Sequence, residues 1–589
     1  MALRKGRAFI QSLKYALSFL KVMRTHGISE ATRRSKFVLH NAFYSLKMSG
    51  MRFPWLRSAK RIANSVTGKT RISILMPVYN TDPEVLSETI ESVLSQTYRN
   101  WELCICDDCS TSNETLEVLG RYKGIDPRIK IARSPSNLHI SGATNLAMEF
   151  STGEFVTFLD HDDTIEPDAM ECIAEAIGHY QNVDLLYTDE DKITAGGTHV
   201  DPNHKPGWSP EYLHTVMYIM HIFVIRKGLL LELGGLREQF SGAQDYDLAL
   251  RASNRTKHIV HIRKILYHWR RLSGSAAALV DAKPQALLNS RAALESAVKE
   301  CDPEARVLDG LTPGTFRVQW PIPRDTAVTL LIPTNAQRAD VKDRGNILLI
   351  RNLLESVVKK TTWQHYKILV IDNHNLASED CAYIESLGGK VVHYTYDGKF
   401  NFSKKMNFAF ECVDTEHVII LNDDTEVISG DWIESLLSFS TREAIGAVGA
   451  KLLFPNDRIQ HAGILISDDA VCAHAFYNLG KNDTEYFGCT ELIKNYPAVT
   501  GAAMATRMSL VKRIGGFREE FGTDYNDVDF CLRLRELGFR SVYTPYALLY
   551  HFENATIRRT AADTSESALF KSLWKGKISA DTDFIPTSK

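Results

Sequence analysis

Residues 72–80 read ISILMPVYN, and residues 328–335 read VTLLIPTN. Each is an apolar run that ends at polar residues, which predicts a buried strand. Four further segments recur around each run in the same order. The first set reads CICDDCS (104–110), FVTFLDHDD (155–163), QDYDLALR (244–251) and YHW (267–269). The second set reads ILVIDNHN (368–375), VIILNDD (418–424), NDVDFCLR (526–533) and YHF (550–552). A repeat of this length predicts two homologous domains rather than a solenoid.

Strands and helices alternate within each copy. Helical periodicity at residues 83–96 follows the first strand, and another apolar strand follows at 101–106. This alternation predicts an α/β fold in which helices cover both faces of a mostly parallel, Rossmann-like sheet. We expect one such domain at 69–275 and a second at 326–556. The same reading predicts a helical linker at 276–325 and a polar, loosely held tail at 557–589.

The N-terminal residues 1–68 are predicted to form a basic, amphipathic helical arm. Residues 1–62 hold 14 Lys and Arg but a single acid, Glu30, although the net charge of the chain is −2. Such an arm can lie on an anionic membrane surface, or it can dock on the first domain or steady a dimer, and the sequence leaves both readings open. It lacks any recognisable nucleic-acid-binding fold, so we expect no nucleic-acid partner. No apolar stretch is long enough to span a bilayer. The ten scattered cysteines show no disulfide framework, which favours a reducing, cytoplasmic compartment.

Polar side chains stand at the ends of the predicted strands, where ligands bind in open α/β sheets. The first domain places Tyr79, Asn80, Asp107, Asp108 and residues 160–163 there. In LDHDD, Asp160 and Asp162 flank one turn residue, so both carboxylates can face one hard cation such as Mg²⁺ or Mn²⁺ beside a diphosphate. An acidic helix start is the alternative, with Asp163 as its cap. The second copy has Asn422 at the first acidic position, so its metal would rely mainly on Asp424.

Each copy also has an acid that opens an amphipathic helix, Asp245 in the first and Asp527 in the second. A carboxylate that projects from the helix start into the crevice can take a proton from an acceptor hydroxyl, although capping of the helix is the alternative. The acids two positions later are expected to cap the helix or to pair with an arginine, as Asp247 with Arg251 and Asp529 with Arg533. His268 and His551 could complete the coordination of a metal or hold a phosphate oxygen.

These segments resemble the inverting glycosyltransferases of family 2, which have the GT-A fold, and in particular the tandem two-domain members of bacterial O-antigen, capsule and rhamnan synthesis. In the first half the resemblance rests also on WELCICDDCST, HISGATNLA, YTDEDK and HKPGWSPEYL. In the second half it rests also on NFSKKMNFA, QHAGI, AVTGAAMATR and YTPYALLYHFENAT. Any one of these stretches is weak alone, but their order, repeated twice, is specific.

The resemblance implies a role for each matching position. Those that would bind the nucleotide and its diphosphate are Pro77, Tyr79, Asp107, Asp108, Asp160, Pro333, Asn335, Asp372 and Asn422. Those that would hold the metal are Asp160, Asp162, His268, Asp424 and His551. Asp245 and Asp527 match the general base. The chain departs from the family pattern at Gln244, at the segment DNHNLAS and at Asn422.

We therefore expect a bifunctional, inverting, metal-dependent glycosyltransferase that uses Mg²⁺ or Mn²⁺. Its donors would be nucleotide sugars (dTDP-rhamnose or a UDP-sugar), and its acceptor a growing, lipid-linked bacterial surface polysaccharide. It would be cytoplasmic and peripheral at the inner face of the membrane. One alternative is an active domain beside a catalytically silent, glycan-binding one, and another is a non-enzymatic sugar-binding scaffold. A nucleotidyltransferase would need a basic pyrophosphate loop near the first strand, and MPVYNTDPE (76–84) is not basic.

Overall fold

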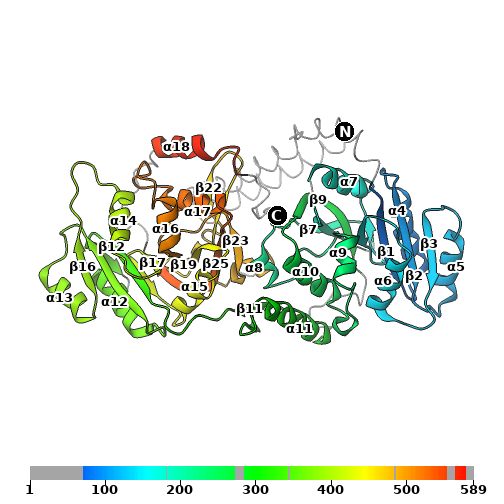
Figure 1. The fold of residues 1–589 in the computed structure, drawn as a ribbon, viewed down its shortest axis with the longest axis horizontal. Helices are drawn as coiled ribbons and strands as arrows, with labels where there is room; N and C mark the ends of the chain where they lie inside the picture. Colours follow the sequence, from blue (N-terminus) through cyan, green and yellow to red (C-terminus); the bar gives the residue numbers. More distant parts are fainter. Residues whose placement is uncertain are drawn as a thin grey trace, which may run out of the picture. The chain divides into compact units, whose positions relative to one another are not determined.

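The computed structural model describes residues 70–180, 182–194, 196–271, 284–341, 345–482, 486–552 and 564–578. The predicted N-terminal arm lies outside these residues. The described part contains two large mixed sheets, each flanked by helices (Figure 1). Among the described residues, no helix is both long and apolar enough to cross a membrane.

The first sheet has the strand order β3-β2-β1-β4-β8-β6-β9-β5, with β7 beside β6. Its strands are β1 (Ile72–Val78), β2 (Trp101–Asp107), β3 (Ile129–Arg133), β4 (Phe155–Phe158), β5 (Thr164–Ile165), β6 (Leu185–Ile193), β7 (His199–Asn203), β8 (Phe223–Arg226) and β9 (Ile259–Arg270). Its helices are α4 (Pro83–Leu94), α5 (Asn113–Tyr122), α6 (His139–Glu149), α7 (Ala169–His179), α8 (Pro210–Leu213), α9 (Lys227–Glu232), η1 (Glu238–Phe240) and α10 (Gln244–Arg255).

The second sheet repeats this topology with the order β16-β15-β12-β17-β24-β19-β25-β18. Its strands are β12 (Val328–Thr334), β15 (Tyr366–Asp372), β16 (Lys390–His393), β17 (His417–Leu421), β18 (Thr425–Val427), β19 (Ile445–Leu453), β20 (Ile459–His461), β23 (Lys494–Tyr496), β24 (Ala503–Arg507) and β25 (Arg540–His551). Its helices are α12 (Leu349–Lys360), α13 (Ser378–Ser386), α14 (Phe402–Glu411), α15 (Trp432–Ser440), α16 (Met508–Ile514) and α17 (Asn526–Glu536). Smaller elements are β13 (Arg338–Val341), β14 (Gly345–Leu348), β21 (Ile464–Ile466), β22 (Cys472–His474) and η3 (Tyr486–Glu491).

The predicted α/β class and the duplication are confirmed, and the sheets are mixed. Four strands of each sheet run parallel, β3-β2-β1-β4 and β16-β15-β12-β17. The next strand in each, β8 or β24, is antiparallel to its neighbours. A parallel pair follows in each sheet, β6 with β9 and β19 with β25, and a short antiparallel strand, β5 or β18, forms the edge. Two domains with one uncommon strand order are what a duplicated sequence would produce.

Alternating side chains of the central strands pack against helices on opposite faces. Ile72, Ile74 and Met76 of β1 share a core with α4 and α5, whereas Leu75 packs with α6. Successive side chains of a strand point to opposite faces, so both faces of this buried strand must be apolar. Figure 1 shows α4–α6 around β1–β3, and α12–α14 around β12 and β16. This layering leaves the carboxyl ends of the parallel strands at one edge of each sheet.

The linker contains more structure than its sequence predicts. The expected helix is confirmed as α11 (Pro284–Cys301). The connection after it contains an antiparallel hairpin, β10 (Arg306–Asp309) with β11 (Phe316–Gln319). These strands are only four residues long, too short for a clear alternating pattern.

Residues of the two domains form direct contacts. Glu211 of α8 is buried, and its carboxylate oxygens lie 2.6 and 3.1 Å from the guanidinium of Arg540 on β25. Burial alone would raise the pKa of Glu211, but the Arg540 charge holds it below the usual range. One residue before α8, the Ser209 hydroxyl donates to Asn495 Oδ1 at 2.8 Å. Removal of either partner would leave an uncompensated buried charge, so this contact depends on both residues.

The C-terminal segment corrects the expectation of a loosely held tail. Within it, α18 (Thr564–Trp574) packs on the second domain, with Phe570 and Trp574 buried. The Phe570 ring stacks on Tyr525 with centroids 4.8 Å apart, and the Trp574 indole N–H donates to Asp529 at 3.0 Å. A few apolar side chains in a polar segment are a weak sequence signal, and their burial depends on a surface that only the folded domain provides.

Candidate functional site

The first domain gathers its polar strand ends at one edge. β1 pairs in parallel with β2 and with β4, so the segments after Val78, Asp107 and Phe158 leave the sheet on the same side. Tyr79 is 44% exposed there, whereas Asp107 is buried. Asp107 accepts a hydrogen bond from the Ser110 amide at 3.0 Å and lies 3.4 Å from the Arg133 guanidinium. The predicted strand ends therefore do meet.

The loop after β2 is held in place by its neighbours. The Asn80 side-chain oxygen accepts from the amides of Thr111 and Ser112 at 2.8 and 2.9 Å. Asp108 is buried and accepts from the Leu138 amide at 2.6 Å and from the Ser134 hydroxyl at 3.2 Å. Leu138 immediately precedes α6, so Asp108 fastens the start of that helix.

The LDHDD segment forms a turn in which the Asp163 amide donates to the Asp160 carbonyl at 3.3 Å. Asp160 and Asp162 are only partly buried, whereas Asp163 is fully buried. Burial and the neighbouring Asp160 carboxylate raise the pKa of Asp162, against the opposing effect of His161. Two carboxylates that disfavour each other's charge suit a divalent cation, so the donor set fits the expected metal.

Asp163 does not cap a helix, contrary to the sequence-based alternative. Its carboxylate accepts from the Tyr267 hydroxyl at 2.6 Å and from the Arg270 amide at 2.7 Å, both on β9. The residue that precedes α7 is Asp168. Asp163 thus ties the acidic turn to β9, which a local sequence pattern cannot reveal.

The acid that opens α10 shares its surroundings with the acidic turn. Asp245 is the second residue of α10 and is half-buried. Burial raises its pKa, His221 opposes that rise, and Asp160 adds to it. His221 Nε2 lies 3.9 Å from Asp160 Oδ2, and its ring stacks on Tyr267 at a centroid distance of 4.5 Å. The structure therefore brings a candidate metal carboxylate and the candidate base around one histidine.

Sequence reasoning missed His221. It stands alone in an apolar segment, MYIMHIF, where a histidine is usually structural. A signal lay in the YTDEDK motif: the Glu190 carboxylate accepts from the His221 amide at 3.1 Å. The preceding acid of the motif, Asp189, accepts from the Lys205 amide at 3.0 Å and lies 2.8 Å from His261 Nε2. The motif thus organises the loops around the site.

His268 lies in a cluster with Asp191, Glu166 and His199 rather than beside Asp160 and Asp162. Its Nδ1 is 2.6 Å from Asp191, the last acid of YTDEDK, and its Nε2 is 3.3 Å from Glu166. His199 Nδ1 is 2.9 Å from the other oxygen of Asp191. Asp191, His199 and His268 each offer one ligand atom, and these atoms lie within 4.8 Å of one another. Among the described residues, the ligand atoms of these three side chains are close enough together to face one metal ion.

The nucleotide segment of the second domain differs in its partners. Asp372 is fully buried and accepts from the amides of Asn375 and Leu376 at 3.1 and 3.3 Å. His393 Nδ1 lies 3.2 Å from Asp372, at the place where Arg133 faces Asp107 in the first domain. Asn335, which follows β12, accepts a hydrogen bond from the Asn375 side chain in the loop after β15. Asn80 accepts from the loop after β2 in the same way.

The acidic turn of the second domain shares one backbone hydrogen bond with the first. The Thr425 amide donates to the Asn422 carbonyl at 3.3 Å, which matches Asn422 with Asp160 and Asp424 with Asp162. Asp424 Oδ1 lies 3.1 Å from His551 Nε2. Asp423, which lies between Asn422 and Asp424, accepts a hydrogen bond from the Thr334 hydroxyl at 2.6 Å. Burial and the Asp424 charge raise the pKa of Asp423 to about 6.

Each candidate base stands two residues before a buried acid that anchors its helix. Asp247 pairs with Arg251 at 2.7 Å and also with Arg237. In the second domain, Asp529 pairs with Arg533 at 2.7 Å and with Arg518 at 3.3 Å. The predicted pairs are confirmed, and the second arginine of each is new. Asp527 itself accepts from the Gly501 amide at 2.8 Å.

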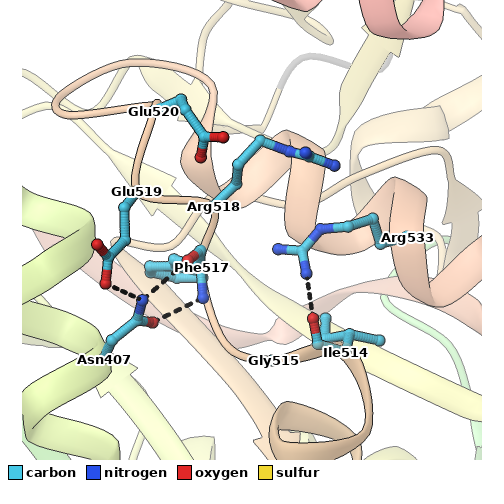
Figure 2. A pocket seen from close by; sticks show the side chains of 8 residues that line it. All are labelled: Asn407, Ile514, Gly515, Phe517, Arg518, Glu519, Glu520 and Arg533. Carbon is cyan, nitrogen blue, oxygen red and sulfur yellow. Dashed lines mark hydrogen bonds between the residues drawn. The ribbon is translucent and has the colours of Figure 1, made fainter.

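A shallow pocket in the second domain exposes this anchoring scaffold (Figure 2). Figure 2 shows Arg533 directed at the Ile514 carbonyl and Asn407 at the backbone of Phe517. The first domain repeats both contacts, with Arg251 on the Leu233 carbonyl and Asn145 on the Leu236 backbone. Since no predicted site residue lines this pocket, we regard it as part of the scaffold. Its lining comprises Asn407, Ile514, Gly515, Phe517, Arg518, Glu519, Glu520 and Arg533.

Known proteins resemble both halves of the chain. Residues 73–234 match the family described as "Glycosyl transferase family 2", and residues 326–569 match "Glycosyltransferase like family 2". The uncharacterized protein y4gI of Sinorhizobium fredii is 37% identical over 87% of this chain and 57% of its own length. The O-antigen biosynthesis protein RfbC of Myxococcus xanthus is 33% identical over 86% of this chain and 39% of its own length.

A third relative matches a shorter segment. It is the UDP-Glc:alpha-D-GlcNAc-diphosphoundecaprenol beta-1,3-glucosyltransferase WfgD of Escherichia coli, 44% identical over 16% of this chain and 35% of its own length. The chain thus spans between about a third and three fifths of these relatives. The two family matches agree with the duplicated sheet. The chain belongs to glycosyltransferase family 2 and carries two domains of that family in tandem.

Proposed function

We propose that each domain transfers a sugar, with inversion, from a nucleotide-sugar donor to a growing bacterial surface polysaccharide. The observation that supports this most is the duplicated arrangement of polar residues at three strand ends, with acids at two of them, together with an acid at the start of a later helix. In the first domain, the Asp160 carboxylate adds to the effect of burial in raising the pKa of both Asp162 and Asp245. Asp424 and Asp527 occupy the matching positions in the second. Retaining such costly partly buried acids twice favours two transfer sites over one.

In the proposed reaction, the acceptor hydroxyl oxygen attacks the anomeric carbon from the face opposite the diphosphate. A bond forms between that oxygen and the anomeric carbon as the bond from the carbon to the diphosphate oxygen breaks. The diphosphate leaves with the electron pair, and Asp245 or Asp527 takes the hydroxyl proton. A raised pKa makes Asp245 a better proton acceptor once it is ionised. No protein nucleophile is required.

The diphosphate carries the charge that grows in the transition state. Asp160 and Asp162 in the first domain, and Asp424 in the second, would hold Mg²⁺ or Mn²⁺, which supplies charge stabilisation to the leaving diphosphate. His268 and His551 are the histidines proposed to assist. His551 already lies 3.1 Å from Asp424, whereas His268 is engaged with Asp191. We propose that Pro77, Tyr79 and Asp107, with Pro333, Asn335 and Asp372, line the nucleoside sites.

The acceptor is proposed to be lipid-linked. WfgD acts on a diphosphoundecaprenol-linked sugar, and RfbC belongs to O-antigen biosynthesis, according to their names. A basic arm at residues 1–62 would place the enzyme at the inner face of the cytoplasmic membrane, where such an acceptor lies. The arm docking on the protein remains the competing proposal.

A panel of nucleotide sugars, including dTDP-rhamnose and UDP-sugars, tests this function in the presence of Mg²⁺ or Mn²⁺. We expect at least one to bind by isothermal titration and to release its nucleoside diphosphate when a glycan acceptor is added. Asp107→Asn and Asp372→Asn should each weaken a different binding event. A panel in which no nucleotide sugar binds would support a non-enzymatic scaffold instead.

The second candidate function is a single active domain beside a silent, glycan-binding one. Asn422 favours it, because the second acidic turn has lost one of the two carboxylates of the first. Titration of the Asp107→Asn variant decides between the two: nucleotide sugar that binds this variant with wild-type affinity belongs to the second domain. Glycan binding without nucleotide-sugar binding in that variant would establish the silent domain.

A further inference from the structure

Two adjacent buried side chains of β20 contact different halves of the second candidate site. Gln460 is 4% exposed and His461 is fully buried. Both belong to the QHAGI segment, to which the proposed reaction assigns no role. β20 pairs with β19, a long buried strand of the second sheet, so its position is fixed by the core.

Gln460 contacts the metal half of the site. Its side-chain oxygen accepts from His551 Nδ1 at 3.0 Å, and the other ring nitrogen of His551 lies 3.1 Å from Asp424 Oδ1. A hydrogen bond to one ring nitrogen of a histidine fixes the ring plane and the tautomer, and therefore the direction of the other nitrogen. Gln460 thus orients His551 toward Asp424.

His461 contacts the base half of the site through the backbone. Its Nε2 accepts from the amides of Gly463 and Thr500 at 3.3 and 3.4 Å, so this nitrogen carries no proton. Its Nδ1 then carries the ring proton and donates to His474 Nδ1, 2.9 Å away. Burial, His474 and His551 all hold the pKa of His461 well below the usual range, so the ring stays neutral and the acceptor persists.

The amide held by His461 is next to the amide that holds the candidate base. Gly501 follows Thr500, and its N–H donates to Asp527 Oδ2 at 2.8 Å. A Cβ on Gly501 would stand 3.3 Å from the Cβ of Asp527, so loop and base are in direct contact. A shift of the loop would therefore shift the Asp527 carboxylate.

The first domain has a different residue at the position that matches Ala502. By strand register, Arg226 pairs with Phe155 in the first sheet as Arg507 pairs with His417 in the second. Counting back from these arginines matches His221 with Ala502. The first domain thus has a histidine beside its base and acidic turn, whereas the second has an alanine and a histidine that acts from β20.

We propose that Gln460 and His461 form a positioning pair that sets, from one short strand, the separation of the metal carboxylate Asp424 and the base Asp527. The inference rests on the proposed transfer function. It assigns separate effects to the two side chains. Gln460 controls metal affinity through His551, and His461 controls turnover through the loop at Thr500 and Gly501.

The test of His461 compares His461→Asn with His461→Gln. Asn retains a donor near the Nδ1 position and loses the acceptor near Nε2, whereas Gln returns an acceptor to that region. With the nucleotide sugar whose transfer Asp527→Asn abolishes, we expect kcat to fall at least about 10-fold in His461→Asn, because small misplacements of reacting groups cost up to about 100-fold. The Kd of that nucleotide sugar should stay within about 2-fold, and His461→Gln should recover most of kcat. His365→Asn, at an exposed position, is the matched control and should behave as wild type.

The test of Gln460 uses Gln460→Leu and a titration of Mn²⁺. We expect the Mn²⁺ concentration for half-maximal transfer to rise about 10-fold or more, as loss of an outer-shell partner typically costs 10- to 100-fold in metal affinity. At saturating Mn²⁺ its kcat should approach wild type. Equal losses of kcat and donor affinity in both variants, or no loss in either, would overturn the proposal.

Hydrogen exchange separates this inference from the proposed function. Amides of residues 498–503 should exchange faster in His461→Asn than in wild type and in His461→Gln, whether or not any sugar is transferred. Unchanged exchange in His461→Asn would refute the role of His461 even with both transfer activities intact. Faster exchange in a protein that transfers no sugar would refute the transfer function and leave the contact to the loop standing.

Discussion

Asp245 and Asp247 are two positions apart on one helix, yet their surroundings give them different properties. Asp247 is fully buried between two arginines, and such an acid holds the fold together. Asp245 is half-buried near Asp160 and His221, and burial raises its pKa. The same division recurs at Asp527 and Asp529. The contacts of each aspartate thus distinguish the candidate base from the acid that stabilises the helix.

Loss of a metal carboxylate should change the metal requirement of one site only. In Asp162→Asn, we expect the Mn²⁺ concentration for half-maximal transfer at the first site to rise by at least about 10-fold, since even outer-shell losses cost that much. Transfer at the second site, measured in the same sample with its own donor, is the control. An unchanged Mn²⁺ titration at the first site would remove Asp162 from the metal site.

A buried carboxylate outside the site should make the first domain sensitive to acid. Burial alone would raise the pKa of Glu102, but Lys130, Ser73 and Thr152 lower it from 4.5 to about 2. A lowered folded-state pKa adds stability above pH 4.5, which is lost as the pH falls from 4.5 toward 2. The melting temperature of wild type should therefore fall more between pH 7 and pH 3 than that of Glu102→Gln. Equal falls in both proteins would contradict the assigned pairing.

The site residues divide into those that sequence can predict and those that it cannot. Asp107, Asp160 and Asp245 follow from strand ends and a helix start, because parallel strands bring their carboxyl ends to one edge. The pair of Asp247 with Arg251 follows from their four-residue helical spacing. His221 was not predicted, because its contacts with Asp160 and Tyr267 join residues far apart in sequence and leave no local spacing pattern.

At the scale of elements, α18 supports the helix that carries Asp527. Glu566 of α18 accepts from the amides of Gly522 and Asp524 at 2.9 and 2.7 Å, in the loop that leads into α17. The aromatic side chains of α18, Phe570 and Trp574, are buried in the core of the second domain. This C-terminal helix thus holds the loop before α17, although the polar composition of the segment predicted a loose tail.

Glu566→Ala should release the loop before α17 from its contact with α18. Removal of the carboxylate leaves backbone amides without their acceptor, which costs about 1–3 kcal/mol for buried groups. We expect a lower melting temperature and slower transfer at the second site, with the first site unaffected. Lys571→Ala lies on the same helix at an exposed position and should match wild type. Equal activity of the two variants at the second site would show that α18 does not support Asp527.

At the scale of the whole molecule, duplication explains why the fold could be predicted so fully. Both copies keep apolar strands with polar ends, and both fold into sheets with one strand order. The hairpin of β10 with β11 and the contacts of Glu211 with Arg540 were not predictable, because short strands and contacts across hundreds of residues leave little local pattern.

Deletion of residues 1–62 tests the proposed membrane role of the arm. These residues carry 14 basic side chains, and each adds about 1 kcal/mol of attraction to an anionic surface. We expect the truncated protein to move from the membrane fraction to the supernatant and to bind anionic vesicles less than the full chain. Unchanged recovery in the membrane fraction would instead favour docking of the arm on the protein.

Linkage analysis of the products of Asp245→Asn and Asp527→Asn shows whether the two domains are separate transferases, as proposed. Each variant should lose one transfer by about 100- to 10,000-fold, as expected for removal of a general base, and keep the other. The two variants should lack different linkages, or different sugars, in the same glycan. If both variants still form every linkage at the wild-type rate, neither aspartate is the base and the account is wrong.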